Sequence, residues 1–345
     1  MSKRFSIPSP VISRPAIVSR LSELIGNTPL FELIRLKNGS RLLLKLEQFN
    51  PTGSAKIRMA QQMLNEAEQK QQLLDGGQIV ESTSGNTGMA LALLAAERGY
   101  RFTAVVDQHA SQDKLRTMRA LGADLVFVSE EEGLATAQRD ALAARMAKDD
   151  PRGIWTEQHN NPANANGYYP LAQELVHALG SNIDILVGAV GTGGSLFGTA
   201  RALRSMCLDF RVIGVEPVGS IVFGGEGGEY YQSGTGTPAG AEIGALIDYA
   251  LLDQGIKVSD VAAFNTARYL ARCRALLVGG SAGGVIYHAL RMLTEQPDGV
   301  TLVALVCDGG ERYLDTIFND KWMEKRRLLD TTMNTELDAI FAGAV

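Results

Sequence analysis

The feature of this sequence that most constrains its fold is the alternation of short apolar runs with stretches of helical spacing. The apolar runs have the length of buried strands: "RLLLKLE", "GQIVES", "FTAVVD", "DLVFVS", "IDILVGAV", "RVIGVEP" and "VTLVALVCD". The helix-like stretches lie at 54–70, 86–98, 111–122, 132–148, 165–180, 194–205, 262–273 and 282–295. Strands that alternate with helices in this way predict an α/β fold built on doubly wound parallel sheets.

Charge and glycine content divide the chain further. The charged stretch "RMAKDDPRG" near 145–153 marks a hinge, with one α/β series before it and one after it. Residues 224–240 are rich in glycine and predict a loop, and a loop of that length in a compact domain is usually functional or mobile. The stretch after about Lys325 is expected to be peripheral. We therefore expect two α/β halves.

Composition excludes several classes of function. The chain has 345 residues, enough for one or two domains, and its formal net charge of −5 argues against a nucleic-acid-binding surface. Cys207, Cys273 and Cys307 are too few and too scattered for a disulfide framework or a zinc site, which predicts a reducing compartment and no metal. The first residues, "MSKRFSIPSPVISRP", hold no apolar segment of signal-peptide length, and no apolar run is long enough to span a bilayer. We expect a cytoplasmic protein that binds no membrane.

Loops at the carboxyl ends of the predicted strands carry the chemistry, because ligands of open α/β sheets bind there. The four that stand out are "NPTGSAK" at 50–56, "ESTSGNTG" at 81–88, "GTGGS" at 191–195 and "CDGGERY" at 307–313.

The loop at 191–195 has the composition of a phosphate cradle. Its glycines, Gly191, Gly193 and Gly194, let the backbone approach an anion, while Thr192 and Ser195 add hydroxyl donors at the start of a helix. A tight turn between strand and helix is the alternative. The loop is a poor dinucleotide fingerprint, because Leu196 stands where the motif needs its last glycine. Glu216 does end the next strand, as a ribose-binding acid would, so a nicotinamide-dependent oxidoreductase stays open as an alternative.

The loop at 81–88 is suited to binding a carboxylate. Its small hydroxyl and amide side chains precede a helix, where backbone N–H groups and hydroxyls can converge on an anion. Capping of the helix by Ser84 or Asn86 is the alternative explanation.

Lys56 lies at the start of a predicted helix for which Ser54 is the expected N-cap. The surrounding "PTGSAKI" lacks the first glycine of an ATP-binding P-loop and the hydroxyl residue after its lysine. Beside a helix N-terminus, this amine is expected to lose its proton more easily than a solvated surface lysine, and a neutral amine is what imine chemistry needs. With a phosphate cradle and a carboxylate loop, Lys56 indicates pyridoxal 5′-phosphate (PLP) as the cofactor and an amino acid as the substrate.

In their order, "NPTGSAKIR", "ESTSGNTG", "GTGGS" and "GERYL" resemble the motifs of the fold type II PLP enzymes, the cysteine synthase and cystathionine β-synthase family. The resemblance spans roughly residues 20–325. It implies a small domain at 42–150 that closes on a large domain made of 1–41 and 151–330, with PLP in the cleft between them and 331–345 as a peripheral tail. A homodimer is usual in the family.

The resemblance also implies roles for individual residues. Lys56 is expected to form the Schiff base with PLP and to act as acid and base. Asn86 is expected to bind the phenolic oxygen of PLP, and the loop 191–195 its phosphate. The substrate α-carboxylate is expected at Thr83, Ser84, Gly85, Thr87 and Gln158.

For several residues, more than one role is possible. The family usually offers a serine hydroxyl to the pyridine nitrogen near "GERY", where this chain has Asp308; either Asp308 contacts that nitrogen, or Ser281 or water does. His159, beside Gln158, is a candidate substrate contact or a structural histidine. Arg139 could bind a substrate phosphate or lie on a solvated face. Arg58 belongs to the family's K-x-R pattern and is expected to pair with a nearby carboxylate.

Within the family, "ESTSGN", "GSIVFG" at 219–224 and "RYLDTIFNDKWMEK" at 312–325 are similar to the N-(2-amino-2-carboxyethyl)-L-glutamate synthases. That similarity implies β-replacement through an aminoacrylate, joining O-phospho-L-serine to L-glutamate in a 2,3-diaminopropionate or siderophore-type pathway. A cysteine synthase or a cystathionine β-synthase-like enzyme is the alternative. A cofactor-binding protein without turnover is a further one.

Overall fold

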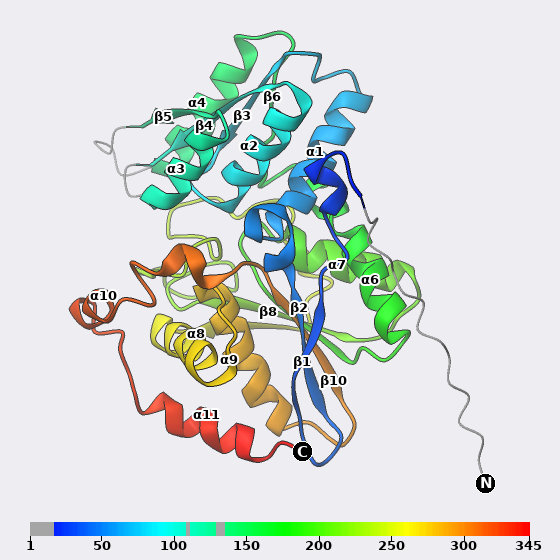
Figure 1. Cartoon of the computed structure of the whole chain (residues 1–345), viewed down its shortest axis with the longest axis vertical. Coiled ribbons are helices and arrows are strands. Elements are labelled where there is room, and N and C mark those ends of the chain that lie inside the picture. The colour runs from blue at the N-terminus through cyan, green and yellow to red at the C-terminus, as the bar shows by residue number, and fades with distance from the viewer. Residues whose placement is uncertain (1–16, 108–110, 129–134) are drawn as a thin grey trace.

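The computed structural model describes residues 17–107, 111–128 and 135–345, which form two α/β units stacked along the long axis of the molecule (Figure 1). Each unit is built on its own sheet, one of six strands and one of four. Within these described ranges, no helix combines the length and the apolar character needed to cross a membrane. The α/β fold with parallel sheets predicted from the sequence is confirmed.

The larger sheet has the strand order β1-β2-β10-β7-β8-β9. In that order the strands are Leu30–Arg35, Arg41–Leu46, Thr301–Val306, Ile185–Ala189, Arg211–Pro217 and Gln254–Val258. Only the pairing of β1 with β2 is antiparallel among these strands. The central strands β7 and β10 are buried at every position, because helices cover both faces of the sheet.

One face of the larger sheet packs against α8, α9 and α11, and the other against α6 and α7. These helices are Asp260–Arg274, Gly280–Thr294, Met333–Ala342, Tyr169–Leu179 and Gly194–Ser205. The short helices α5 and α10 are Pro162–Asn166 and Asp320–Lys325. Alternate residues of β2 separate onto the two faces: Leu42 and Leu44 face the α9 side, and Leu43 faces the α7 side.

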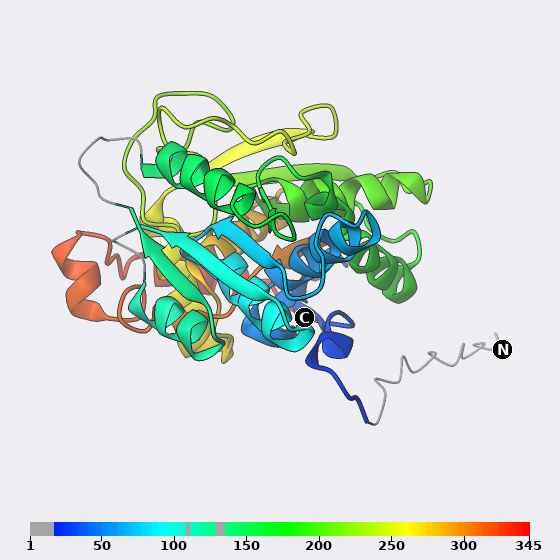
Figure 2. The ribbon, with the colours of Figure 1, turned by 90° about the horizontal axis from the view of Figure 1, so that it is seen from above.

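The smaller sheet is parallel throughout and has the order β5-β4-β3-β6. In that order its strands are Asp124–Phe127, Arg101–Val106, Gln78–Ser82 and Ile154–Trp155. Helices α1, α2 and α3 pack on one face and α4 on the other, as the view from above shows (Figure 2). These helices are Lys56–Gln69, Asn86–Arg98, Gln112–Ala120 and Ala135–Lys148.

The division at residues 42 and 150 needs correction at both ends. The strand β2 at 41–46 pairs with β1 and β10 in the larger sheet, and β6 at 154–155 pairs with β3 in the smaller one. The strands of the smaller sheet therefore lie between residues 78 and 155. Strands β1, β6 and β9 were not predicted, because all three lie at sheet edges and β6 has only two residues.

Two further expectations are wrong. Residues 333–342 form α11, whose Met333, Leu337 and Phe341 are buried against α8 and α9, so 331–345 is not a peripheral tail. Ser54 does not cap α1: its hydroxyl is buried and makes no hydrogen bond to a described residue, its backbone forms a β-bridge with Asp308, and Ala55 takes the N-cap position without a side-chain hydrogen bond.

The predicted helix at 165–180 is interrupted. It divides into α5 and α6 at Gly167, where a Cβ would lie 2.8 Å from the carbonyl oxygen of Arg58. The close approach of the α1 backbone therefore requires glycine at this break.

Candidate active site

A pocket of about 380 Å³ lies between the two units and receives residues from both. It lies at the carboxyl ends of β3, β7 and β10, which is where ligands of open α/β sheets bind. The lining includes nearly all the site residues predicted from the sequence: Lys56, Thr83, Ser84, Gly85, Asn86, Thr87, Arg139, Gln158, His159, Gly191, Thr192, Gly193, Ser195, Ser281 and Asp308. Gly194 is the one that does not line it.

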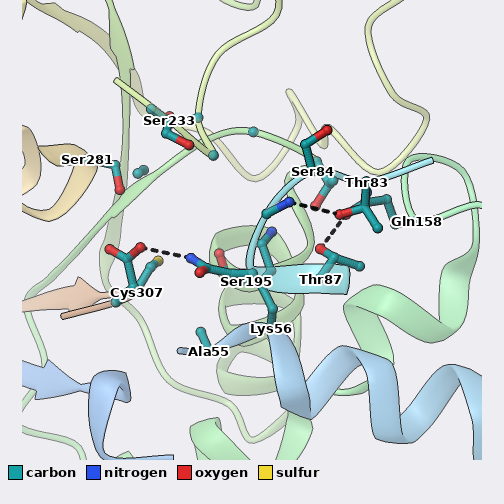
Figure 3. Close-up of a pocket in the computed structure, with 18 of the residues that line it drawn as sticks. Ala55, Lys56, Thr83, Ser84, Thr87, Gln158, Ser195, Ser233, Ser281 and Cys307 are labelled. Atoms are coloured by element: carbon teal, nitrogen blue, oxygen red, sulfur yellow. Dashed lines mark hydrogen bonds between the residues drawn. The ribbon is translucent and has the colours of Figure 1, made fainter. Parts of the chain in front are cut away.

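Lys56 is the first residue of α1, and it lies between the two walls of the pocket (Figure 3). Burial lowers the pKa of its amine, and the nearby Cys307 and Asp308 oppose that shift. The direction agrees with the expectation from the sequence, but the main cause is burial. A lysine with a lowered pKa in a pocket can supply a neutral amine.

The loop 83–87 forms one wall. The Thr83 hydroxyl accepts hydrogen bonds from the backbone N–H groups of Gly85 and Gly88 at 3.4 and 3.2 Å. Thr87 donates to the Gln158 amide oxygen at 2.7 Å. The N-cap of α2 is Gly85, without a side-chain hydrogen bond, so the alternative of capping by Ser84 or Asn86 is not what the structure has.

A buried carboxyl group supports this wall from behind. Glu81 accepts a hydrogen bond from the Gln158 backbone N–H at 3.3 Å and a second from Thr156. Burial raises the pKa of Glu81 to about 8, with the hydrogen bond from Thr156 opposing the shift. This carboxyl fixes the backbone that carries Gln158.

Arg139 reaches the same wall from α4 on the other face of the smaller sheet. Its guanidinium donates to Asp107 at 2.8 Å and to the Ser84 hydroxyl at 3.3 Å, and Ser84 donates to Asp107 at 2.6 Å. Arg139 therefore lies at the pocket and not on a solvated face, with its charge shared with a carboxylate.

The glycine loop 191–195 forms the opposite wall at the N-terminus of α7. Gly193 has φ +86° and is the N-cap, and a Cβ there would lie 2.9 Å from the Leu246 carbonyl oxygen. Gly194 faces away from the pocket: its Cβ would meet Asn164 Oδ1 at 1.9 Å, and its N–H donates to Thr192 at 3.4 Å. Backbone and hydroxyl donors at a helix N-terminus can hold a phosphate.

Asp308 and Asn86 join the two units across the pocket. Asn86 donates to Asp308 Oδ2 at 2.8 Å, and Tyr313 donates to the same oxygen at 2.6 Å. Arg312 donates to the amide oxygen of Asn86 at 2.9 Å. Asp308 Oδ1 is buried and has no hydrogen-bond partner among the described residues.

These residues fit PLP. The cofactor needs an amine for its aldehyde, donors for its phosphate and a polar partner for its ring nitrogen. The pocket supplies Lys56 for the aldehyde and the glycine loop for the phosphate. For the ring nitrogen it offers the carboxyl of Asp308 and the hydroxyl of Ser281, both buried in the lining.

Variants at Asp308 and Ser281 separate these two partners. If Asp308 contacts the ring nitrogen, Asp308→Ser is expected to shift the visible absorbance of the enzyme with bound serine substrate and to slow turnover, because a carboxylate keeps that nitrogen protonated. The matched Ser281→Ala variant is then expected to change neither. The reverse pattern, measured by absorbance spectroscopy, assigns the contact to Ser281.

His159 lines the pocket beside Gln158. Burial lowers the pKa of its imidazole, Asp140 opposes the shift, and Lys56 and Arg139 add to it. The lowered pKa favours the neutral form of this imidazole.

Sequence reasoning missed part of the lining. Lys114 of α3 contributes to the pocket, although it lies far from the four motif loops in the chain. The segment 233–236 also contributes, and it belongs to the glycine-rich loop 224–240 that was expected to be functional or mobile. The Thr235 hydroxyl donates to the Val190 carbonyl at 2.9 Å and so fixes this segment beside the glycine loop. The glycine-rich composition of 224–240 was the available signal for the segment. A lysine in a helix carries no comparable signal.

Glu216, whose position near the end of β8 favoured a dinucleotide-binding enzyme, has a structural role. Glu216 is fully buried and pairs with Lys257, and it accepts hydrogen bonds from the backbone N–H groups of Val222 and Phe223, both at 3.0 Å. Its oxygens hold the loop after β8, and Glu216 does not line the pocket. It does not serve as a ribose-binding acid there.

Comparison with known proteins agrees with this site. A family model described as "Pyridoxal-phosphate dependent enzyme" matches residues 21–308. A candidate cysteine synthase of Sinorhizobium fredii is 49% identical over 326 residues, which cover 94% of this chain and 97% of that protein. The N-(2-amino-2-carboxyethyl)-L-glutamate synthase of Ralstonia nicotianae is 33% identical over 314 residues, or 90% of this chain and 92% of that one.

Among solved structures, the crystal structure of O-ureido-L-serine synthase superposes with a TM-score of 0.82 at 32% identity and covers 89% of this chain and 99% of that one. Family, fold and pocket therefore agree. The chain belongs to the pyridoxal-phosphate dependent enzymes of the cysteine synthase family, with fold type II, and is a PLP-dependent β-replacement enzyme.

Proposed function

We propose that this enzyme joins O-phospho-L-serine to L-glutamate and forms N-(2-amino-2-carboxyethyl)-L-glutamate. The observation that carries the proposal is the wall formed by Ser233, Gly234, Thr235 and Gly236, because it adds polar surface beyond the glycine loop. Sulfide, the acceptor of a cysteine synthase, needs no such surface. An amino-acid acceptor needs donors for its carboxylates and room for its chain. The stretches at 219–224 and 312–325 support the same choice.

In this proposal Lys56 holds PLP and moves the proton at the substrate α-carbon. Bound PLP withdraws electrons from that carbon, which is the chemistry the cofactor supplies. Once the substrate amine has replaced it on the cofactor, the free amine of Lys56 would remove the α-proton, and phosphate would leave from the β-carbon. The amino nitrogen of glutamate then bonds to the β-carbon, and a proton returns to the α-carbon. The lowered pKa of Lys56 supports its role as a base.

The walls of the pocket orient the donor substrate. Thr83, Thr87 and Gln158 would receive its α-carboxylate, together with the backbone N–H groups at the start of α2. The hydrogen bond between Thr87 and Gln158 supports this assignment, because it holds both side chains at the same point of the wall. The loop 191–195 would hold the cofactor phosphate, and Asn86 would bind the phenolic oxygen.

A cysteine synthase is the second candidate. It is favoured by the 49% identity to the candidate cysteine synthase of Sinorhizobium fredii, against 33% to the glutamate-using enzyme. In either case we propose a homodimer in the cytoplasm, as the family resemblance implies.

A donor and acceptor screen separates the two candidates. The holoenzyme is mixed with O-phospho-L-serine or O-acetyl-L-serine, and the change of cofactor absorbance is followed. Glutamate or sulfide is then added, and the product is identified by mass. We expect the glutamate adduct to form fastest after O-phospho-L-serine. Return of the starting spectrum with sulfide, and none with glutamate, would assign a cysteine synthase.

A further inference from the structure

Lys114 is a buried lysine that has no assigned role in the fold or in the proposed function. It lies in the first turns of α3 and lines the pocket, and only 4% of the residue is exposed. A buried ammonium group is unfavourable unless a charge or several hydrogen bonds compensate it. Its surroundings therefore decide what it does.

The contacts of Lys114 are weak for a buried cation. Its amine lies 3.4 Å from the Tyr313 hydroxyl and 3.5 Å from the Ser233 hydroxyl, both at the long limit of a hydrogen bond. It also lies 4.8 Å from the centre of the Tyr313 ring, a cation–π distance. Across the ranges that the structure describes, no carboxylate forms an ion pair with it. Burial lowers the pKa of the amine, and Asp308 partly opposes this.

Arg139 provides the contrast. It also lines the pocket, but it is already paired with Asp107 at 2.8 Å. In the proposed function, Lys56 serves the cofactor and the substrate α-proton. Lys114 is thus the remaining cation of the described lining, and an anionic group that enters the pocket gains most by approaching it.

The place of this amine fits a substrate with two anionic ends. Ser233, which contacts it, lies on the opposite side of the view from Thr83, Thr87 and Gln158, with Lys56 between them (Figure 3). A substrate whose α-carboxylate meets the loop 83–87 can therefore extend past Lys56 toward Ser233.

We propose that Lys114 and Ser233 form a subsite for a second anionic oxygen group of the substrates, a phosphate or a carboxylate. The inference rests on the proposed function and specifies where its anionic substrates bind. An anion there would accept hydrogen bonds from the Lys114 amine and the Ser233 hydroxyl, and its charge would favour the ammonium form of Lys114, which burial disfavours. The source is either the leaving phosphate of the donor or a carboxylate of the acceptor.

Binding is tested first, without turnover. Inorganic phosphate and glutarate are titrated into the holoenzyme by calorimetry, because bound PLP already fills the glycine loop. We expect Lys114→Met to weaken binding of at least one of them about 10- to 100-fold, the range for a hydrogen bond to a charged group. Lys114→Arg is expected to retain binding, and Ser233→Ala to weaken it several-fold. The control is Lys37→Met, because Lys37 is an exposed lysine away from the pocket.

Kinetic measurements then show whether the anion is the leaving phosphate or a carboxylate of the acceptor. If Lys114 binds the leaving group, Lys114→Met slows the absorbance change with O-phospho-L-serine by at least tenfold more than that with O-acetyl-L-serine. If it binds the acceptor, both donors react alike and only the step with glutamate slows, not the step with sulfide. Equal losses with all four compounds would mean that Lys114 merely supports Tyr313, and would overturn the subsite.

The two proposals fail separately. A wild-type enzyme that uses neither O-phospho-L-serine nor glutamate contradicts the proposed function, while the calorimetric comparison still decides the subsite. Unchanged phosphate and glutarate affinities in Lys114→Met, with circular dichroism and cofactor absorbance like those of the wild type, overturn the subsite whatever the substrates are.

Discussion

Lys56→Ala is expected to lower turnover by roughly 10³-fold or more, because in the proposed function this one side chain both holds the cofactor and moves the substrate proton. The fold is expected to stay intact. The Lys56 amine makes no hydrogen bond to a described residue that the protein would lose, and the variant leaves unchanged the glycine loop that we propose for the cofactor phosphate. Steady-state assays and thermal unfolding of the two apo-proteins measure both effects.

Chemical labelling checks the same assignment directly. Borohydride reduction of the wild-type holoenzyme should fix the cofactor mass on Lys56. A modified Lys56 resists trypsin, so the mass should appear on the peptide that follows Lys45 and ends at Arg58. The exposed variant Lys37→Ala serves as the control and should label like the wild type. Cofactor mass on any other lysine contradicts the assignment.

The sequence allowed most of this site to be predicted because its chemistry is local. Each motif loop follows its own strand, and parallel strands end at the same edge of a sheet, so residues as distant as Lys56 and Asp308 meet. Short glycine, hydroxyl and amide patterns identify such loops without knowledge of tertiary structure.

The residues that were missed depend on long-range packing. Lys114 lines the pocket only because α3 of the smaller unit lies against Tyr313 and Ser233 of the larger one, and nothing in its neighbouring sequence encodes that contact. The packing of α11 was missed for the same reason: Met333, Leu337 and Phe341 have helical spacing, but they are buried only because α8 and α9 lie against them. Ser54 shows the converse: despite its strong capping preference, its hydroxyl makes no hydrogen bond to a described residue, and its backbone forms a β-bridge with Asp308.

Arg58 shows how a local pattern and a long-range network combine. The sequence suggested pairing with a carboxylate, and the structure gives it two. Its guanidinium donates to Glu47 at 2.6 and 2.9 Å and to Glu174 at 2.8 and 2.9 Å. Lys45 binds Glu174 at 2.6 Å from the far side. Arg58, at the centre of this network, lies in the first turn of α1, two residues after Lys56.

The pKa values agree with a tightly coupled network. Burial alone would lower the pKa of Arg58, but Glu47 and Glu174 outweigh burial and raise it. Burial favours the neutral form of Glu174, and Arg58 and Lys45 reverse this to bring its pKa to about 2 from a usual 4.5. Because the folded pKa lies below the unfolded one, this stabilisation is present above pH 4.5 and is lost as the pH falls toward 2.

Arg58→Met is expected to lower the free energy of unfolding by about 3–5 kcal/mol, because it leaves the buried Glu47 without its cation. Urea unfolding at neutral pH measures this change. The matched control is Arg35→Met, which removes a two-point contact of the same chemistry with Glu32, but one whose side chains are 43% and 38% exposed. Exposed pairs are worth about 0–1 kcal/mol, so the control should change little. Similar small losses in both variants would mean that the network orients α1 without stabilising the fold.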